Sequence, residues 1–353
     1  MSLEDRTREL AGDVEPADGT AIRAAGERHS KLAKPPGSLG RLEELGVRLA
    51  GMAGECSPPV PENPAVVVCA GDHGVLARGV SPWPNEVTAA MVRNFCAGGA
   101  AVNALARTVG ARISVLDVGV ASELERHPML RTAKVRPGTS DLSQGSAMER
   151  EEAARAMLAG AGVAEELISS GGVDLLVTGD MGIGNTTPAA CLIATFTGRS
   201  AEEVTGCGTG IDDATLKLKV RVIEEALELH APDPGDPLGA LAALGGLEHA
   251  ALAGVILTGA VYGVPVVLDG IVSDSAALVA RALAPACVDY MISGHLSTEP
   301  GAGIALENLG LVPLLDLDMR LGEGTGGLLA VPLTQAAARV LGEMATLEEI
   351  SLA

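Results

Sequence analysis

Short apolar runs rich in β-branched residues alternate along the chain with longer Ala-rich stretches of helical spacing. The apolar runs are continuous rather than alternating, as expected of parallel strands that helices cover on both faces. The predicted strands are AVVVCAG (65–71), ISVLDVG (113–119), VDLLVTG (173–179), VPVVLDG (264–270), DYMISG (289–294) and LVPLLDLD (311–318). The predicted helices cover 85–108, 147–170, 213–230, 246–262, 274–284 and 325–341. This alternation predicts an α/β sheet with crossover connections.

The beginning of the chain follows a different pattern. Its first 55 residues contain two polar amphipathic helices joined by KPPGSLG (34–40) and no strand. We therefore expect two domains. Residues 1–60, together with 331–353, are predicted to form a small helical domain, and residues 61–330 an α/β domain.

Composition changes this picture in two ways. The chain has 353 residues, of which 47% are hydrophobic and only 1% aromatic, with 45 glycines. The core must therefore consist of Ala, Val, Leu and Ile, with glycines in loops and at close contacts. The net charge of −20 argues against nucleic acid and against insertion into an anionic membrane, because both need a basic face. A small anionic ligand remains compatible, because local backbone amides and a few cations can bind it.

Cysteine usage and the N-terminus favour a cytoplasmic protein. The six cysteines are scattered without a C-x-x-C pair, as is typical of reduced thiols, and MSLEDRTREL is charged throughout, unlike a secretory signal. Residues 250–268 carry no charge over 19 positions, near the length of a membrane span. Three glycines and Pro265 within this segment favour a buried helix followed by a buried strand.

Polar residues follow the ends of most predicted strands. Because parallel sheets bind ligands outside the carboxyl ends of their strands, we expect these residues to line one cleft. They are Asp72-His73 after the first strand, the run 180–188 after VDLLVTG, Ser273-Asp274-Ser275, the run 295–301, and Glu323 in the turn MRLGEGTGG.

The segment GDMGIGNTTPAA (179–190) is the best candidate for a phosphate site. Its glycines permit close backbone approach, and Asn185 or Thr186 can cap the following helix. The spacing G-x-x-G-x-G is neither a dinucleotide fingerprint nor a P-loop, so a tight strand–helix connection stays an alternative. A second glycine-rich turn precedes a helix with Lys217 and Lys219, which taken alone predicts two solvated lysines.

Three further features admit both structural and chemical interpretations. His73 and His295 lack further ligands at metal-binding spacing, which favours hydrogen-bonding histidines over a metal site. The carboxylates of Asp274 and Glu299 suit helix caps or first-turn acids equally well. Glu323 stands between two glycines with only Arg320 nearby, and local reasoning leaves a helix-terminal acid and a catalytic one equally open.

Taken together, the motifs resemble the nicotinate-nucleotide–dimethylbenzimidazole phosphoribosyltransferases, a family that assembles the lower ligand of cobalamin. The resemblance covers nearly the whole chain. It rests on KPPGSLGRLEELG (34–46), AGDHGV (70–75), GVSPWPNEVTAAMVRNF (79–95), GDMGIGNTTPAA (179–190), GTGIDD (208–213), VPVVLDG (264–270), GHLSTEPG (294–301) and RLGEGTGG (320–327).

The resemblance implies a fold and a reaction. The fold would be a Rossmann-like parallel six-stranded sheet with helices on both faces, which makes 61–330 the catalytic domain, plus the small helical domain from the chain termini. The reaction would transfer the 5-phosphoribosyl group of nicotinate mononucleotide to 5,6-dimethylbenzimidazole, giving α-ribazole 5′-phosphate and nicotinate. No cofactor and no metal are implied. The family forms homodimers, which would place KPPGSLG near the partner's cleft.

The resemblance also implies site residues. Glu323 would be the general base that removes the benzimidazole N–H proton, with Gly322 and Gly324 letting it approach a flat ring. Asp180 would lie near the ribose and the reacting carbon. The predicted contacts to the substrates are Gly182, Gly184 and Asn185 through backbone amides to the phosphate, Thr186, Lys219 near the phosphate, His295, and Ser81 in the loop of the base pocket. Trp83, the single tryptophan, either stacks on the base or fills the core.

Two other functions remain as alternatives. The first is a paralogue that uses adenine or a phenol as acceptor, which would differ from the family only in its acceptor pocket. A non-catalytic nucleotide-binding relative would be expected to lose Glu323, Asp180 or Lys219, and all three are present.

Overall fold

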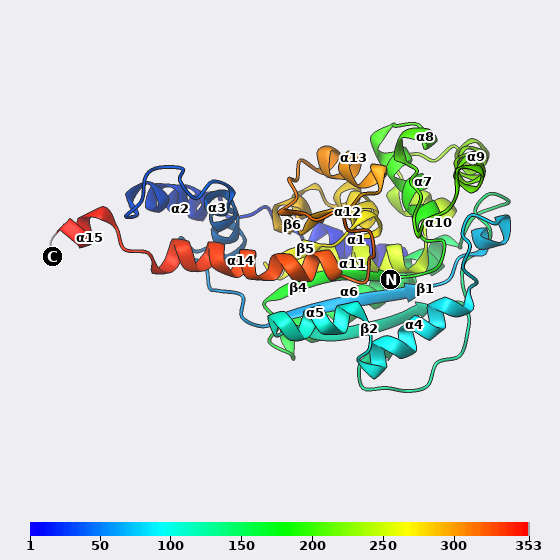
Figure 1. The fold of residues 1–353 in the computed structure, drawn as a ribbon, viewed down its shortest axis with the longest axis horizontal. Helices are drawn as coiled ribbons and strands as arrows, with labels where there is room; N and C mark the ends of the chain where they lie inside the picture. Colours follow the sequence, from blue (N-terminus) through cyan, green and yellow to red (C-terminus); the bar gives the residue numbers. More distant parts are fainter. Residues whose placement is uncertain (352–353) are drawn as a thin grey trace.

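A six-stranded parallel sheet forms the centre of the computed structural model, which describes residues 1–351 (Figure 1). Its strands lie in the order β3-β2-β1-β4-β5-β6, and every neighbouring pair is parallel. Two short strands, β7 and β8, pair separately. The strand bounds are β1 Pro64–Gly71, β2 Arg112–Gly119, β3 Leu130–Thr132, β4 Leu175–Met181, β5 Val266–Leu268, β6 Met291–Ser293, β7 His295–Leu296 and β8 Leu315–Asp316.

The strand order reverses between β1 and β4. From β1 the chain moves outward to β2 and β3, then returns to the centre and moves the other way through β4, β5 and β6. The loops after β1 and β4 therefore diverge, which opens a crevice at the carboxyl edge of the sheet. The expected α/β class and the parallel six-stranded sheet are confirmed.

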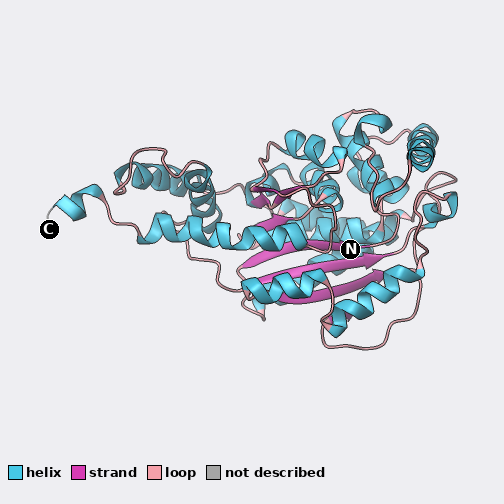
Figure 2. Ribbon diagram, viewed as in Figure 1, coloured by secondary structure: helices cyan, strands magenta, loops and turns pink. Residues whose placement is uncertain are grey.

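Helices cover both faces of this sheet (Figure 2). Helices α6, α11 and α12 pack on one face, and α4, α5 and α14 pack on the other. The helix bounds are α1 Leu3–Gly12, α2 Gly19–Lys31, α3 Arg41–Ala53, α4 Glu86–Ala97, α5 Ala101–Val109, α6 Arg150–Ser169, α7 Thr186–Thr197, α8 Ala201–Val204, α9 Asp213–His230, α10 Pro237–Leu244, α11 Leu247–Val261, α12 Ile271–Leu283, α13 Pro300–Leu309, α14 Thr325–Glu343 and α15 Leu347–Ser351, with 3₁₀ helices η1 Gly74–Arg78 and η2 Pro285–Tyr290.

The chain termini build an arm that extends from the sheet. Helices α2 and α3 pack against α14, whose far end projects with α15 beyond the sheet (Figure 1). Helix α1 instead packs against α6. The division into 1–60 with 331–353 and 61–330 remains a proposal about folding units.

Several predicted elements differ from the observed ones. The predicted strand 311–318 shrinks to Leu315–Asp316 and pairs with β7 rather than joining the large sheet. The sixth strand is instead Leu130–Thr132, a three-residue edge strand too short to give a pattern. The predicted helix 85–108 is two helices, because the chain turns at Gly98 with φ of 79°. The start of the chain forms three helices rather than two.

The uncharged segment 250–268 forms most of the buried helix α11 and the buried strand β5, as predicted. Among residues 1–351, no helix is both long enough and apolar enough to cross a bilayer.

Glycines allow α6 and α11 to pack backbone against backbone. A Cβ on Gly160 of α6 would collide with the carbonyl oxygen of Ala251, and one on Gly254 of α11 would collide with that of Met157. Because both obstacles are backbone atoms, neither helix can accept the extra methyl group without moving. Glycine inside a helix is unfavourable by itself, so this contact offsets a local cost.

We predict that Gly160→Ala destabilises the protein by about 1–3 kcal/mol, because overpacking forces the two helices apart. Gly162→Ala is the matched control on the same helix. Nothing lies within 4 Å of its Cβ position, so the better helix propensity of alanine is expected to stabilise by about 0.5–1 kcal/mol. Urea unfolding of the three proteins measures both effects, and equal stabilities of the two variants would contradict the close contact.

Candidate active site

A cleft that encloses about 700 Å³ of space, open solvent included, lies at the carboxyl edge of the sheet. Four segments supply most of its walls: the β4–α7 loop, the turn before α9, the residues after β6 and the turn before α14. The lining residues are Val80, Ser81, Asp180, Gly182, Ile183, Gly184, Asn185, Thr186, Cys207, Gly208, Thr209, Ile211, Lys219, Gly270, Ile271, Val272, His295, Ser297, Glu299, Arg320, Leu321 and Gly322.

Asp180 lies near the end of β4 with its side chain almost fully buried. Its Oδ2 accepts a hydrogen bond of 2.8 Å from Nδ2 of Asn185. Burial, together with the nearby Asp269 and Glu248 carboxylates, raises the pKa of Asp180 well above its usual value. Asn185 does occupy the N-cap position of α7, but its side chain makes no capping bond. Its N–H donates to the Gly182 carbonyl oxygen, so the amide predicted to bind phosphate is already engaged.

Lys219 on α9 has a buried ammonium group, although its position in a helix favoured a solvated one. Its Nζ donates to Oγ1 of Thr186 at 2.8 Å and to the Gly206 carbonyl oxygen at 3.1 Å. Burial lowers the pKa of Lys219, and the charge of Glu299 opposes that shift. Glu299 in turn accepts the Gly208 N–H at 2.7 Å. The two glycine-rich turns are therefore tied together around one cation, while Lys217 is exposed.

The turn before α14 holds Glu323 in an unusual backbone conformation. Gly322, Glu323 and Gly324 have φ of 81°, 64° and 88°, and such a conformation costs a non-glycine residue about 1–3 kcal/mol. The Glu323 side chain is 4% exposed, and its Oε2 has no hydrogen-bond partner among the described residues. Burial raises its pKa, and a hydrogen bond from the Val102 N–H opposes this. Gly322 lies over the carboxylate of Asp180.

Asp269, which the sequence analysis did not select, fixes this turn from below. It follows β5, is fully buried, and accepts hydrogen bonds from the N–H groups of Gly324 (3.1 Å), Gly326 (2.7 Å) and Gly327 (3.0 Å) at the start of α14. Burial raises its pKa, opposed first by the charge of His295. An acid directly after a buried strand is the one signal that marked it in the sequence.

The cleft brings together most of the predicted site residues, which come from five distant parts of the chain. Those in its lining are Ser81, Asp180, Gly182, Gly184, Asn185, Thr186, Lys219, His295 and Gly322. Glu323 and Gly324 lie behind this lining. Arg320 does not pair with Glu323, because its Nη1 donates to the Gly208 carbonyl oxygen. Trp83 is 51% exposed, which excludes a core-filling role.

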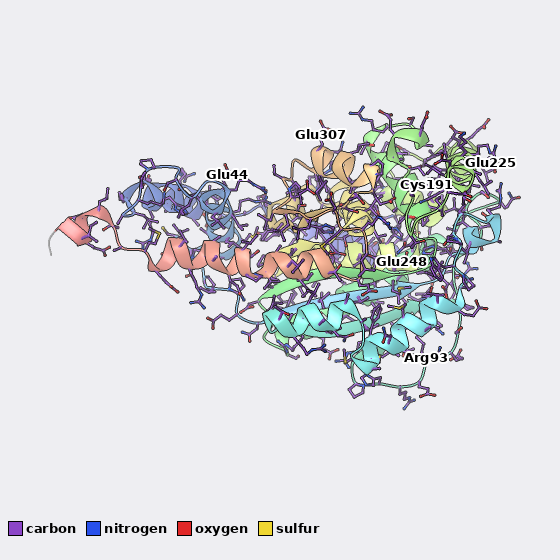
Figure 3. All side chains as sticks on the ribbon, viewed as in Figure 1. Glu44, Arg93, Cys191, Glu225, Glu248 and Glu307 are labelled. Atoms are coloured by element: carbon purple, nitrogen blue, oxygen red, sulfur yellow. The ribbon has the colours of Figure 1, made fainter. Side chains whose placement is uncertain are left out.

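His73 belongs to a buried cluster behind the cleft. Its Nε2 lies 2.8 Å from Oε1 of Glu248, which also lies 2.8 Å from Nδ1 of His249. Glu248 sits amid the packed elements near the sheet (Figure 3), and Gly182 packs against the His73 ring. His295 has its Nε2 3.8 Å from Oδ1 of Asp269. Within residues 1–351, no three His, Cys, Asp or Glu side chains converge as a metal site would require.

Comparison with known proteins gives a consistent result. A family model described as phosphoribosyltransferase matches residues 14–351. The nicotinate-nucleotide–dimethylbenzimidazole phosphoribosyltransferase of Salinispora tropica is 54% identical, with 100% of both chains covered. The protein of the same name from Chloroflexus aggregans is 55% identical over 99% of this chain and 98% of its own.

A solved structure agrees along most of the chain. The crystal structure of the phosphoribosyltransferase of that name from Thermus thermophilus superimposes with a TM-score of 0.90 at 48% identity, covering 95% of this chain and 99% of the other. A second structure, described as CobT from the same organism, gives 0.91 at 49% identity, with 94% and 98% covered.

The unpartnered carboxyl group of Asp274, also behind the cleft, yields a pH-dependent prediction. Asp274 is fully buried, and neither of its oxygens has a hydrogen-bond partner among the described residues. Burial, followed by the charge of Asp269, raises its pKa well above the usual value. The folded state thus keeps this proton to a higher pH than the unfolded chain does. The stability contributed by the neutral carboxyl is complete at low pH and is lost as the pH rises towards the folded-state pKa.

Asp274→Asn is therefore expected to raise the free energy of unfolding by about 1–3 kcal/mol at pH 8 and by much less near pH 4, because each pKa unit corresponds to about 1.4 kcal/mol. Guanidinium unfolding at the two pH values measures the difference. Glu224→Gln, at an exposed position of α9, is the control and should show no such gain. A gain of the same size at both pH values would contradict the titration of Asp274.

Proposed function

Because the chain belongs to the nicotinate-nucleotide–dimethylbenzimidazole phosphoribosyltransferase family, we propose that it transfers the 5-phosphoribosyl group of nicotinate mononucleotide to 5,6-dimethylbenzimidazole. The products are α-ribazole 5′-phosphate and nicotinate, and the reaction belongs to cobalamin biosynthesis. The observation that carries this proposal is a buried carboxylate, Glu323, with one unpartnered oxygen directly behind the wall of a cleft that also holds Lys219.

In the proposed reaction, one ring nitrogen of dimethylbenzimidazole forms a bond to the anomeric carbon of the ribose. The bond from that carbon to the nicotinate nitrogen breaks, and its electron pair stays with the neutral pyridine ring. Positive charge develops on the benzimidazole, which acidifies the N–H of its other nitrogen. The chemistry therefore needs a base for that proton and no acid for the leaving group.

Glu323 is the proposed base. A carboxylate with raised pKa retains a proton more strongly than an exposed one, which suits proton abstraction near neutral pH. The free Oε2 gives the proton a place to go. Asp180, which lies beside Gly322 on the cleft wall, is proposed to contact the ribose near the reacting carbon.

The phosphate is proposed to bind at the opposite end of the cleft. Gly182, Gly184 and Thr186 lie at the start of α7, where backbone N–H groups and the helix dipole favour an anion. The Lys219 ammonium adds a positive charge beside Thr186. The Lys219 ammonium and these backbone N–H groups are together proposed to hold the phosphate of the ligand.

A homodimer is the proposed assembly. Three large apolar side chains, Val312, Leu317 and Leu321, are more than half exposed, and exposed apolar surface is typical of faces that a partner covers. The segment 34–40 lies on the arm and lines no part of the cleft in its own chain, and its proposed place is near the cleft of a partner. Sedimentation equilibrium tests this, because a species of the single-chain mass of 35.6 kDa would refute it.

We also propose a cytoplasmic location. The six cysteines are all free thiols, as is typical of a reducing compartment. Recovery of the protein with periplasmic or membrane fractions after cell disruption would contradict this.

The proposed activity is tested by incubating the purified protein with nicotinate mononucleotide and a panel of bases. We expect α-ribazole phosphate and free nicotinate with 5,6-dimethylbenzimidazole. Nicotinate release with adenine or a phenol alone would instead establish the paralogue. Binding of the nucleotide without release in the presence of any base would establish the non-catalytic relative.

Glu323→Gln is predicted to lower kcat about 100-fold or more, as expected when a general base is lost, with little change in the affinity for nicotinate mononucleotide. Glu307→Gln, at an exposed site on α13 (Figure 3), is the control. Single-turnover kinetics and calorimetric binding measure the two quantities. Near-normal turnover of Glu323→Gln would refute the assignment.

The pH dependence follows from the same carboxylate. A base must be ionised, so activity is expected to fall as the pH drops through the raised pKa of Glu323. The apparent pKa of the acidic limb of the kcat/KM profile is therefore predicted to lie above the usual range for a glutamate. A limb that persists unchanged in Glu323→Gln would assign it to another group.

A further inference from the structure

Asp269 links the centre of the sheet to the turn that holds Glu323. Its own N–H donates to Oγ1 of Thr178 at 3.2 Å, and that hydroxyl donates to the Val267 carbonyl oxygen at 3.3 Å. Both Asp269 oxygens accept N–H groups from the start of α14, Oδ1 two of them and Oδ2 one. Asp269 thus connects β4 to α14, through its backbone N–H on the β4 side and its carboxylate on the α14 side, and it is fully buried.

The turn above Asp269 would not keep its shape unaided. Three successive residues have left-handed φ, and the middle one is Glu323. The chain also packs directly on β4 there. A Cβ on Gly179 would stand 2.7 Å from the Glu323 carbonyl oxygen. The backbone of Glu323 therefore packs on Gly179 of β4. The residues that follow Glu323 are held in place by their hydrogen bonds to Asp269.

Titratable groups from four parts of the fold face Asp269. They are His295 on β7, Asp274 on α12, Asp180 on β4 and Glu323 itself. The negative charge of Asp269 acts on Glu323 across this buried space. Asp269 therefore influences Glu323 in two ways, through the geometry of the turn and through the field at its carboxyl group.

We propose that Asp269 is a positioning residue for phosphoribosyl transfer, which holds the Glu323 carboxylate where it can take the proton of the incoming base by fixing the first N–H groups of α14. This rests on the proposed function. Asp269 itself does not touch the substrates, because it lies outside the cleft lining and beneath the turn.

The test compares Asp269→Asn with a control variant, Asp274→Asn. Both variants lose one buried carboxylate, but the Asp274 carboxyl group accepts no hydrogen bond from the described residues. An asparagine at 269 offers one oxygen for three N–H groups and turns an NH₂ group towards at least one of them. We expect kcat to fall about 10- to 100-fold, because a small misplacement of a catalytic group lowers the rate by this order. The KM for nicotinate mononucleotide is expected to change less than about threefold. Asp274→Asn should keep the wild-type kcat.

The pH profile separates positioning from simple destabilisation. Removal of the Asp269 charge should move the acidic limb of kcat/KM to lower pH, because that charge raises the pKa of Glu323. A reduced folded fraction would scale the activity without moving the limb. Wild-type kcat in Asp269→Asn, equal losses in the two variants, or an unmoved limb would each overturn the proposal.

Thr178→Val provides a second route should Asp269→Asn fail to fold. It removes the hydroxyl that anchors Asp269 while keeping the shape of the side chain, and a fall in kcat of about 3- to 10-fold is expected, as for a smaller misplacement. Wild-type kcat in folded Thr178→Val would overturn the proposal in that case.

A crystal structure gives a readout that does not need activity. In the crystal structure of folded Asp269→Asn, the Glu323 carboxyl group is expected to lose its hydrogen bond with the Val102 N–H. An unmoved carboxyl group would overturn the proposal. A wild-type protein that is inactive with every base would refute the proposed function. Movement of Glu323 in the variant would then still support the structural part of the proposal, that Asp269 holds Glu323 in place.

Discussion

The contact on which the geometry of the cleft depends is the one between the Asp269 carboxylate and the amides at the start of α14. Three hydrogen bonds to a charged acceptor are each worth roughly 1.5–3 kcal/mol, while the left-handed backbone of Glu323 costs about 1–3 kcal/mol. These hydrogen bonds act against that strain. Because Asp269 stands at the end of β5, the position of Glu323 is set by the sheet and not by the flexible turn itself.

Close contacts between backbones explain part of the high glycine content of the chain. With almost no aromatic residues, the core is built from small aliphatic side chains, and elements approach until backbones touch. Gly160 and Gly254 bring α6 and α11 together, and Gly179 and Gly324 bring the Glu323 turn onto the sheet. Dispersion contacts increase steeply at short range, so such packing replaces the area that large aromatic rings would supply.

Charge is distributed unevenly within an acidic protein. Lys219 and Arg320 are the cations of the cleft lining, and both bind carbonyl oxygens of the turn at 206–208. Asp180 and Glu323 lie close enough for the Glu323 charge to contribute to the raised pKa of Asp180. Burial strengthens these effects, because the effective dielectric constant inside the protein is low. A net charge of −20 is thereby compatible with a proposed phosphate site, since local groups outweigh the distant surface charges.

The sequence by itself determined the features that depend on neighbouring residues. Continuous apolar runs predicted β1, β2 and β4 within about two residues, and helical spacing predicted α9 over 213–230. Motif resemblance placed Asp180 and Lys219, both of which lie in the cleft lining. Local pattern failed where an element depends on a distant partner. Residues 311–318 have the hydrophobicity of a central strand, yet only two of them pair, and with β7.

Tertiary structure alone decided the partners of the polar groups. Nothing local distinguishes Lys217 from Lys219, but only Lys219 faces the turn at 206–208. Nothing near Asp269 in the sequence shows that α14, more than 50 residues later, supplies its three donors. The conformation of Glu323 likewise follows from what lies beneath it. Periodicity records whether a residue faces water or the core, whereas a buried charge is defined by the specific groups that the fold brings to it.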